Sequence, residues 1–173
     1  MLHFKRIESP IGKILLIANA SGLCLAEFED DLTDDKLQTI AFKFNQDLSE
    51  SKNEILETTE AQLNNYFKKK LTTFNIALSP RGTDFQKTVW NSLQEIPFGK
   101  LKTYKIQSEC LKSPEAIRAI ASANGKNPIA IIIPCHRVIG SDGNLTGYSG
   151  GLWRKKWLLE HEGSQNTGQV SLF

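Results

Sequence analysis

A cysteine and a histidine are neighbours in this sequence, at Cys135 and His136, directly after Pro134. A thiol becomes a strong nucleophile when a nearby imidazole removes its proton. Neighbouring side chains of a regular strand point to opposite faces, so these two can cooperate only where the backbone turns, and Pro134 favours a turn. An imidazole works best when a carboxylate orients it, and a later helix offers Glu160 and Glu162. By itself, such a pair is more often a structural cysteine beside a hydrogen-bonded histidine.

The segments around this pair predict a short strand, two loops and a helix. The apolar run 129–133 is rich in isoleucine and is typical of a buried strand. Glycine-containing segments at 140–143 and 146–151 are either simple connections or the walls of a pocket in which the backbone approaches a ligand closely. A helix is expected at 152–162, and Gly163 would end it as a C-cap.

Three helical segments are expected ahead of this run. Thr83 and Gln86 have the spacing of a capping box, and apolar residues then recur on one helical face until a proline and a glycine. Two shorter helices are expected at 104–110 and at 114–124, the second behind Ser113 as its N-cap. Two short helices joined by a tight turn predict a helix-turn-helix.

The helix expected at 114–124 has an unusually small surface, and Arg118 is its only basic residue. Small side chains let a helix backbone approach another surface closely. The helix either packs tightly in the core or enters a nucleic-acid groove with Arg118 as the one long probe. Its small residues are Ala116, Ala119, Ala121, Ser122 and Ala123.

The first eighty residues carry no combination of side chains with an identifiable chemistry, and we interpret them as a scaffold. Alternation of apolar and polar residues between two turn signals predicts an antiparallel meander with strands at 2–7, 13–18 and 23–29. Helical spacing predicts helices at 33–44 and 59–70.

The expected fold class is α/β with two domains. Residues 1–80 would form a small N-terminal α/β domain with an antiparallel sheet, and residues 81–173 a mainly helical C-terminal domain that contains the helix-turn-helix. The formal net charge of +2 conceals a difference between them. The first part has 9 Lys and Arg against 12 Asp and Glu, and the second has 12 against 7. The basic part is therefore the candidate for binding a polyanion.

Composition excludes several classes of protein. A chain of 173 residues with 40% hydrophobic and 23% charged residues has the composition of an ordinary folded protein and not of a disulfide-rich miniprotein or a disordered chain. Its longest apolar run is too short to span a bilayer and no signal peptide is visible, so we expect a cytoplasmic protein that does not contact membranes. Its three cysteines, Cys24, Cys110 and Cys135, cannot pair completely and form no CxxC pair, which argues against a disulfide framework and against a structural zinc site.

Residues 134–140, Pro-Cys-His-Arg-Val-Ile-Gly, resemble the active-site signature of the O6-alkylguanine-DNA alkyltransferases, also called methylated-DNA–protein-cysteine methyltransferases. The resemblance covers about the last ninety residues in order, and its combination of motifs is highly specific. The first eighty residues resemble the family's variable N-terminal domain more loosely, around 9–12. The other matching segments are Gly82 to Gln86, Val89-Trp90, Ile96-Pro97, Thr103-Tyr104, Arg118-Ala119, Asn127-Pro128, Thr146 to Tyr148, Gly150 to Leu152 and Leu158 to Glu162.

The resemblance implies a catalytic set. Cys135 would accept the alkyl group from O6-alkylguanine in duplex DNA after the nucleotide is flipped out, and O4-alkylthymine is left open as a second substrate. His136 would act on the thiol through a bound water, and Glu162 would orient His136. Asn127 would brace the site, and the hydroxyl of Tyr104 would face guanine N3.

The resemblance also implies how the protein holds its substrate. Arg118 would fill the gap that the flipped nucleotide leaves in the duplex. The guanine pocket would be lined by Val138, Tyr148 and Ser149. The helix expected at 114–124 would enter the minor groove, with further contacts to DNA from Ser113, Ala116, Ala119 and Ser122.

The chemistry implies a protein that reacts once. A thioether lacks a good leaving group, so each molecule would repair one lesion and keep the alkyl group. No metal or organic cofactor is expected, because the lesion itself carries the transferred group. The expected partner is double-stranded DNA that contains O6-alkylguanine, bound by a monomer.

The sequence departs from the family's pattern at two places in the helix-turn-helix. Gln107 and Ser108 stand where the family usually has a hydrophobic residue followed by alanine, and Lys112 stands where it has a glycine in the turn. A turn residue other than glycine predicts strained backbone at Lys112. His3 and Cys24 are too few to form the zinc site that some members have in their N-terminal domain.

Other functions account for parts of the pattern. A cysteine hydrolase would also use a Cys-His pair, but no oxyanion signature is visible and direct adjacency is atypical of that class. A protein that only binds alkylated bases would resemble this family in every element except the cysteine, and Cys135 is present. A sequence-specific transcription regulator needs helix side chains that contact base edges, and the alanine-rich helix argues against that function.

Overall fold

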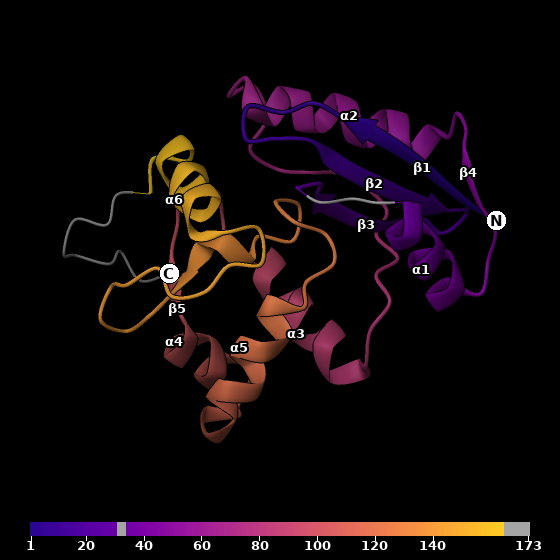
Figure 1. The fold of residues 1–173 in the computed structure, drawn as a ribbon. Coiled ribbons are helices and arrows are strands. Elements are labelled where there is room, and N and C mark those ends of the chain that lie inside the picture. Colours follow the sequence, from indigo (N-terminus) through magenta and orange to yellow (C-terminus); the bar gives the residue numbers. More distant parts are fainter. Residues whose placement is uncertain (31–33, 165–173) are drawn as a thin grey trace. The chain divides into compact units, whose positions relative to one another are not determined.

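The chain folds into two units, Met1–Arg81 and Gly82–Phe173, in a computed structural model that describes residues 1–30 and 34–164 (Figure 1). The first unit is a mostly antiparallel sheet with two helices, and the second is mainly helical, which confirms the predicted fold class. The helix-turn-helix stays a prediction. In chain order the elements are β1 (Leu2–Ile7), β2 (Ile14–Asn19), β3 (Gly22–Phe28), α1 (Asp34–Phe44), β4 (Leu48–Glu50), α2 (Glu54–Phe67), α3 (Asp84–Gln94), β5 (Lys102–Thr103), α4 (Tyr104–Cys110), the 3-10 helix η1 (Pro114–Ala116), α5 (Ile117–Gly125), the 3-10 helix η2 (Cys135–Arg137), β6 (Val138–Ile139) and α6 (Leu152–His161).

Two polar turns build the sheet of the first unit, whose strand order is β3-β2-β1-β4. Between β1 and β2 the N–H of Gly12 donates to the carbonyl of Ser9 (3.2 Å), and a φ of 111° makes glycine the favoured residue there. Between β2 and β3 the side-chain oxygen of Asn19 accepts hydrogen bonds from the N–H groups of Ser21 (2.8 Å) and Gly22 (3.1 Å). The three antiparallel strands predicted from the sequence are confirmed, and a fourth, β4, pairs parallel to β1.

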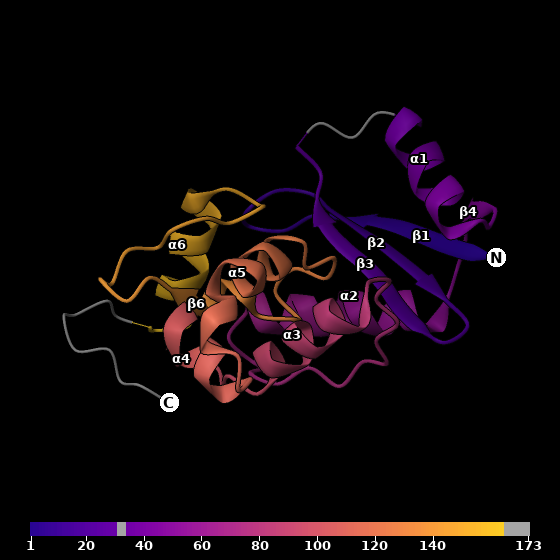
Figure 2. The same cartoon turned by 90° about the horizontal axis from the view of Figure 1, so that it is seen from below.

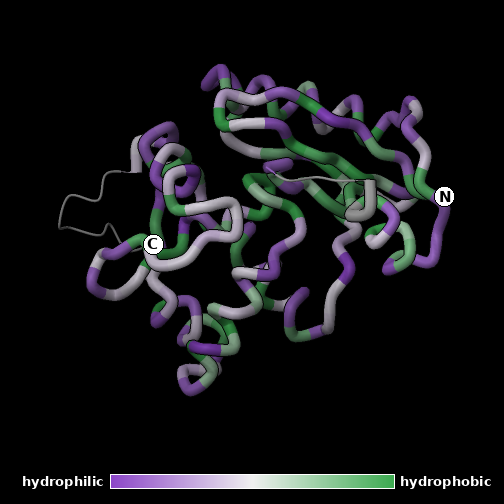
Figure 3. The backbone as a smooth tube through the Cα atoms, in the orientation of Figure 1, coloured by the Kyte–Doolittle hydropathy of each residue, from purple (hydrophilic) through white to green (hydrophobic). Residues whose placement is uncertain are grey.

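Both faces of this sheet are covered. Ile40 of α1 belongs to the same buried core cluster as Leu15 and Ile17 of β2, and α2 contacts β1, β2 and β3 (Figure 2). Strand β2 is consequently buried at five of its six positions, and the hydropathy colouring shows a continuous apolar stretch along this sheet (Figure 3). The helices predicted for this unit are present, with one shifted start. α2 begins at Glu54 instead of residue 59, because Asn53 caps it by accepting from Ile55 and Leu56.

Helix α3 confirms the predicted capping box. The Thr83 hydroxyl accepts a hydrogen bond from the N–H of Gln86 (3.2 Å), and the Gln86 side chain accepts one from the N–H of Thr83 (2.9 Å). The buried indole of Trp90 on this helix donates to the carbonyl of Ala123 (2.8 Å) on α5. Because both ends of this contact are buried, α5 is held at a fixed place against α3.

The prediction of a strand at 129–133 is wrong. These residues form a buried turn, in which the N–H of Ile133 donates to the carbonyl of Ile129 (3.1 Å) and Ile131 has a φ of 70°. The N–H of Ile129 donates to the side-chain oxygen of Asn127 (3.0 Å). Backbone polar groups are thus satisfied inside the turn and by a neighbouring amide. An apolar run reports burial, and here burial does not imply an extended chain.

A short parallel ladder, which the sequence did not reveal, brings the two halves of the second unit's functional region together. Lys102 pairs with Val138 and Thr103 pairs with Ile139. Thr103 is also the N-cap of α4, since its hydroxyl accepts from the N–H of Ile106 (3.1 Å). The ladder therefore places the start of α4 directly beside η2.

Ser113 stands at the predicted N-cap position, but it caps with its backbone alone. Its carbonyl accepts a hydrogen bond from the N–H of Ala116 (2.9 Å) at the start of the 3-10 helix η1, which precedes α5, and its side chain makes no capping hydrogen bond. The N–H of Ser113 donates to the carbonyl of Ser108 (2.9 Å), so the same residue also closes the end of α4. Gly125 is the last residue of α5, and Lys126 is its C-cap.

Helix α4 ends in a turn that normally uses glycine. The N–H of Lys112 donates to the carbonyl of Glu109 (2.9 Å), which together with the bond of Ser113 gives the pattern of a Schellman motif. In that motif the residue after the cap is left-handed, and Lys112 has a φ of 55°. The strained backbone predicted at this lysine is present.

We expect Lys112→Gly to raise the free energy of unfolding by about 0.5 to 1 kcal/mol, because glycine adopts this conformation without strain. Chemical denaturation of the two proteins measures the difference. Lys87→Gly is the matched control: Lys87 is exposed within α3, where glycine should lower stability by about 1 kcal/mol. A Lys112→Gly protein that is less stable than the unsubstituted chain would contradict the strain argument.

Candidate active site

The 3-10 helix η2 supplies the turn that Cys135 and His136 require. Pro134 precedes it with a φ of −84° and a ψ of 63°, and the N–H of Cys135 donates to the carbonyl of Ile133 (2.9 Å). Both Cys135 and His136 are buried. The backbone therefore leaves the extended conformation at the point where the sequence predicted a turn.

Asn127 holds the sulfur of Cys135 in place. Its Nδ2 donates to the Sγ of Cys135 (3.2 Å) and to the carbonyl of Ile133 (2.7 Å). Its oxygen accepts the N–H of Ile129 (3.0 Å), so the amide has both ends engaged and cannot turn. Asn127 thereby fixes the position of the thiol relative to the buried turn.

The carboxylate of Glu162, at the C-cap of α6, is the most highly bonded group of the site. Its Oε1 lies 2.7 Å from the Nε2 of His136 and 3.0 Å from an Nη of Arg137. Its Oε2 accepts from the Nε of Arg137 (2.9 Å) and from the N–H of Gly99 (3.3 Å). Arg137 also donates to the carbonyl of Ile96 (2.6 Å), so the guanidinium joins α6, η2 and the segment after α3.

These contacts determine the protonation of the pair. Burial would raise the pKa of Glu162, but the hydrogen bonds from His136 and Arg137 and the charge of Arg137 outweigh it and hold that pKa well below its usual range. Burial lowers the pKa of His136, although Glu162 opposes the shift. An ionised carboxylate only accepts hydrogen bonds, so a neutral His136 carries its proton on Nε2. Its buried Nδ1 has no hydrogen-bond partner among the described residues and is a proton acceptor.

The charge on Lys155 supports the thiol. Burial raises the pKa of Cys135, while the hydrogen bond from Asn127 and the positive charge of Lys155 lower it. Lys155 is itself fully buried, and burial lowers its pKa to about 8. Its ammonium group ties α6 to the loop after β6. The Nζ donates to the backbone carbonyls of Val138 (2.6 Å), Leu145 (2.5 Å) and Gly147 (3.2 Å).

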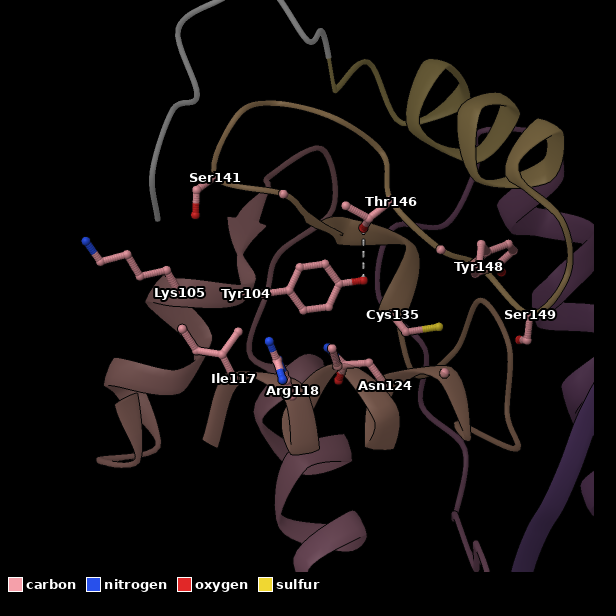
Figure 4. Close-up of a pocket in the computed structure, with 14 residues that line it drawn as sticks. Tyr104, Lys105, Ile117, Arg118, Asn124, Cys135, Ser141, Thr146, Tyr148 and Ser149 are labelled. Atoms are coloured by element: carbon pink, nitrogen blue, oxygen red, sulfur yellow. Dashed lines mark hydrogen bonds between the residues drawn. The ribbon is translucent and has the colours of Figure 1, made fainter. Parts of the chain in front are cut away.

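A pocket of about 560 Å³ opens in front of Cys135, which is in the usual size range for a small-molecule site (Figure 4). The ring of Tyr104 lies above Arg118 and Asn124 in this view, with Cys135 beside them. The Tyr104 hydroxyl accepts a hydrogen bond from Thr146 (3.3 Å), and burial raises the pKa of this phenol, which keeps it protonated.

The structure brings most of the candidate catalytic residues together. Among the residues to which the resemblance gives a role in catalysis, DNA contact or the guanine pocket, those that line this pocket are Tyr104, Arg118, Cys135, Tyr148 and Ser149. Asn127, His136 and Glu162 lie behind Cys135 in the buried cluster just described.

Other candidate residues lie outside the pocket. Val138 is fully buried and is absent from the described lining of the pocket. Its backbone carbonyl accepts a hydrogen bond from Lys155. Glu160, the alternative carboxylate, pairs with Lys156 (3.8 Å) on the exposed side of α6. The four residues named only for DNA contact are also outside the described lining: Ala119 and Ser122 are exposed on α5, whereas Ser113 and Ala116 are half-buried.

Sequence reasoning missed two charged residues of this site. Arg137 was visible only as part of the motif, and nothing in its spacing reveals that it clamps Glu162. The position of Lys155 in the sequence could have indicated its burial. It stands three residues before Leu158 and four before Leu159, and so lies on the same buried face of the helix. A lysine on an apolar face indicates a buried, fully bonded ammonium group.

The described residues contain no group of three His, Cys, Asp or Glu side chains that could hold a metal ion. Within the same part of the chain, no helix is long and apolar enough to cross a membrane.

Comparison with protein families gives two matches that follow each other along the chain. The model described as "6-O-methylguanine DNA methyltransferase, ribonuclease-like domain" matches residues 2–80. The model described as "6-O-methylguanine DNA methyltransferase, DNA binding domain" matches residues 84–164. Together they extend over nearly all of the residues that the structure describes.

Individual relatives and solved structures agree with these matches. A methylated-DNA–protein-cysteine methyltransferase of Methanosarcina barkeri is 48% identical over 161 residues, which cover 93% of this chain and 97% of that protein. The protein of the same name from Mycobacterium bovis is 42% identical over 178 residues, which cover 100% of this chain and 99% of that protein. The crystal structure of Mycobacterium tuberculosis O6-methylguanine methyltransferase has a TM-score of 0.80 at 38% identity, covering 99% of this chain and 98% of that one. A crystal structure of Mycobacterium tuberculosis OGT in complex with DNA has a TM-score of 0.80 at 40% identity and covers 94% and 93%.

We expect Arg137→Met to lower the free energy of unfolding at pH 7 by about 3 kcal/mol, because it leaves the buried carboxylate of Glu162 without its charged partner. The sign of the pH dependence follows from the lowered pKa of Glu162. Its contribution is complete above the ordinary glutamate pKa of about 4.3 and is lost as the pH falls further. The difference between the two proteins should therefore narrow in acid, as measured by denaturation at several pH values.

Lys156→Met is the matched control, since Lys156 pairs with a carboxylate on the same helix at an exposed site. It should change stability by less than about 0.5 kcal/mol. If Arg137→Met and Lys156→Met lower the free energy of unfolding by the same amount, the buried ion pair of Arg137 and Glu162 stabilises the protein no more than an exposed pair does.

Proposed function

The chain belongs to the 6-O-methylguanine DNA methyltransferase family, and we propose that Cys135 is the residue that accepts the alkyl group. The protein repairs DNA by transferring the alkyl group of O6-alkylguanine to a cysteine, as a methylated-DNA–protein-cysteine methyltransferase. One observation carries the assignment to Cys135: of the three cysteines, it is the one that lines the pocket and has a hydrogen-bonded sulfur beside a polarised histidine. Cys24 is buried in the first unit and Cys110 is exposed.

The resting thiol must lose its proton before it attacks. His136 is the base, because its Nδ1 is a free acceptor and Glu162 stabilises the positive charge that the ring gains. A bound water would carry the proton between the sulfur and Nδ1. The hydrogen bond from Asn127 and the charge of Lys155 stabilise the thiolate that forms.

The transfer is a displacement at the alkyl carbon. A carbon–sulfur bond forms to Cys135 as the bond between that carbon and O6 of guanine breaks, and the bonding electrons pass to the base. The hydroxyl of Tyr104 stabilises this charge by donating a hydrogen bond to guanine N3, which its raised pKa permits at neutral pH. The thioether that results has no good leaving group, so each molecule reacts once.

The target carbon lies inside a base pair, so the nucleotide must leave the duplex, at a cost of a few kcal/mol. Arg118 stands exposed on α5 at the rim of the pocket and would occupy the space left by the base. Ala119 and Ser122 on the same helix are small and exposed, which lets the helix backbone approach the minor groove. One chain contributes every residue of this arrangement, so we propose that it acts as a monomer on O6-alkylguanine in duplex DNA.

We expect a duplex with a single O6-methylguanine to add one methylene mass to each protein chain, located at Cys135 by peptide mapping. The amount of repaired DNA should equal the amount of protein and no more. Cys135→Ser should abolish repair, whereas Cys110→Ser, which removes the exposed thiol, should leave it unchanged. An alkyl group found on another residue, or repair by Cys135→Ser, would refute the assignment.

We expect Arg118→Ala to slow repair of duplex DNA about tenfold to a hundredfold, because the variant lacks the side chain that offsets the cost of flipping. Its reaction with free O6-alkylguanine base should stay within about twofold, since a free base needs no flipping. Lys126→Ala is the charge control. Lys126 is exposed after α5, and its loss should weaken DNA binding in a salt-dependent way without changing the maximal rate. Equal losses of Arg118→Ala on the two substrates would assign Arg118 another role.

A further inference from the structure

Two buried amides face each other between α4 and α5. The Nε2 of Gln107 donates to the Oδ1 of Asn124 (3.2 Å), and the Nδ2 of Asn124 donates to the Oε1 of Gln107 (2.7 Å). Gln107 also donates to the hydroxyl of Ser92 on α3 (3.1 Å), which in turn donates to the carbonyl of Val89 (2.7 Å). Gln107 has no exposed surface and Asn124 is 3% exposed. A polar group buried to this extent is retained only with its partners in place.

One member of this pair belongs to the pocket. Asn124 lines it, and Figure 4 shows its side chain below the ring of Tyr104, between Arg118 and Cys135. Gln107 is absent from the described lining and acts from behind the wall. The two hydrogen bonds run in opposite directions, so they fix which end of the Asn124 amide faces which way.

We propose that Gln107 is a positioning residue for base binding: by locking the amide of Asn124, it makes this side of the pocket a rigid wall against which the alkylated base packs. The proposal rests on the function proposed above and adds a specificity element to it. A wall that is already ordered saves the entropy of ordering a side chain when the base enters. It also keeps the amide from turning unpaired donors and acceptors toward the base.

Removal of one partner should therefore be worse than removal of both. Gln107→Leu leaves the buried amide of Asn124 without its reciprocal partner and free to rotate into the pocket. Gln107→Leu combined with Asn124→Leu replaces both amides by apolar groups of similar size, which restores a satisfied wall. Ser92→Ala removes only the outer hydrogen bond of Gln107 and leaves the amide pair intact.

The test measures binding separately from transfer. In a Cys135→Ser background, which cannot accept the alkyl group, the dissociation constant of free O6-benzylguanine is measured with and without each substitution. We expect Gln107→Leu to weaken binding about tenfold relative to the Cys135→Ser protein, the double variant to bind more tightly than Gln107→Leu, and Ser92→Ala to lie within about threefold of the Cys135→Ser protein. With the native cysteine, Gln107→Leu should raise the concentration of base at half-maximal reaction by a similar factor and leave the maximal rate within about twofold.

Gln62→Leu is the matched control for the substitution itself, since Gln62 makes a reciprocal pair of hydrogen bonds with the backbone of Asn75 in the first unit. It should not change base binding. A Gln107→Leu protein that binds the base like its parent would overturn the proposal, as would a double variant that binds no better than Gln107→Leu. A loss of thermal stability without a change in binding would show that the pair is only structural and would equally overturn it. If the native protein binds the base without transferring its alkyl group to Cys135, the proposed function fails while the binding result still decides the role of Gln107.

Discussion

The buried carboxylate of Glu162 is the interaction on which the site depends. A carboxylate in the protein interior is costly unless charges and hydrogen bonds surround it, and here Arg137, His136 and the N–H of Gly99 do so. These groups come from three segments that are distant in the sequence, so the cluster holds α6, η2 and the chain after α3 at one point. It also orients the ring of His136 and determines which of its nitrogens carries the proton. The position of Cys135 on η2 follows from the same cluster.

The surroundings of Cys135 suit a reagent that is used once. Burial raises the pKa of the thiol, so the resting sulfur is mostly protonated and reacts slowly with other electrophiles. The groups that favour the thiolate are already in place, since Asn127 donates to the sulfur and the buried ammonium of Lys155 supplies a positive charge. Under the proposed function, selectivity comes from the pocket, which would place the alkyl carbon next to a nucleophile that His136 activates.

Local signals predicted most of the fold, and remote contacts account for what they missed. The capping box at Thr83 and the polar turns of the first sheet act within a few residues, and each is present as predicted. The composition of the run 129–133 predicts a strand, because an apolar run alone does not distinguish a buried turn from an extended chain. The clamp of Arg137 on Glu162 joins residues 25 positions apart, and the amide pair of Gln107 joins residues 17 apart. No spacing rule relates such partners, so only the packed structure shows them.

The central claim is that burial keeps His136 neutral, while Glu162 holds its proton on Nε2 and leaves a free acceptor at Nδ1. Nitrogen NMR of the His136 ring, assigned by comparison with a His136→Gln protein, measures this directly. We predict that Nε2 is protonated, that Nδ1 is not, and that this state persists as the pH is lowered from about 8 to about 6, below the ordinary histidine pKa of about 6.5. A proton on Nδ1 at neutral pH, or a ring that becomes charged with a midpoint at or above about 6.5, would contradict the account.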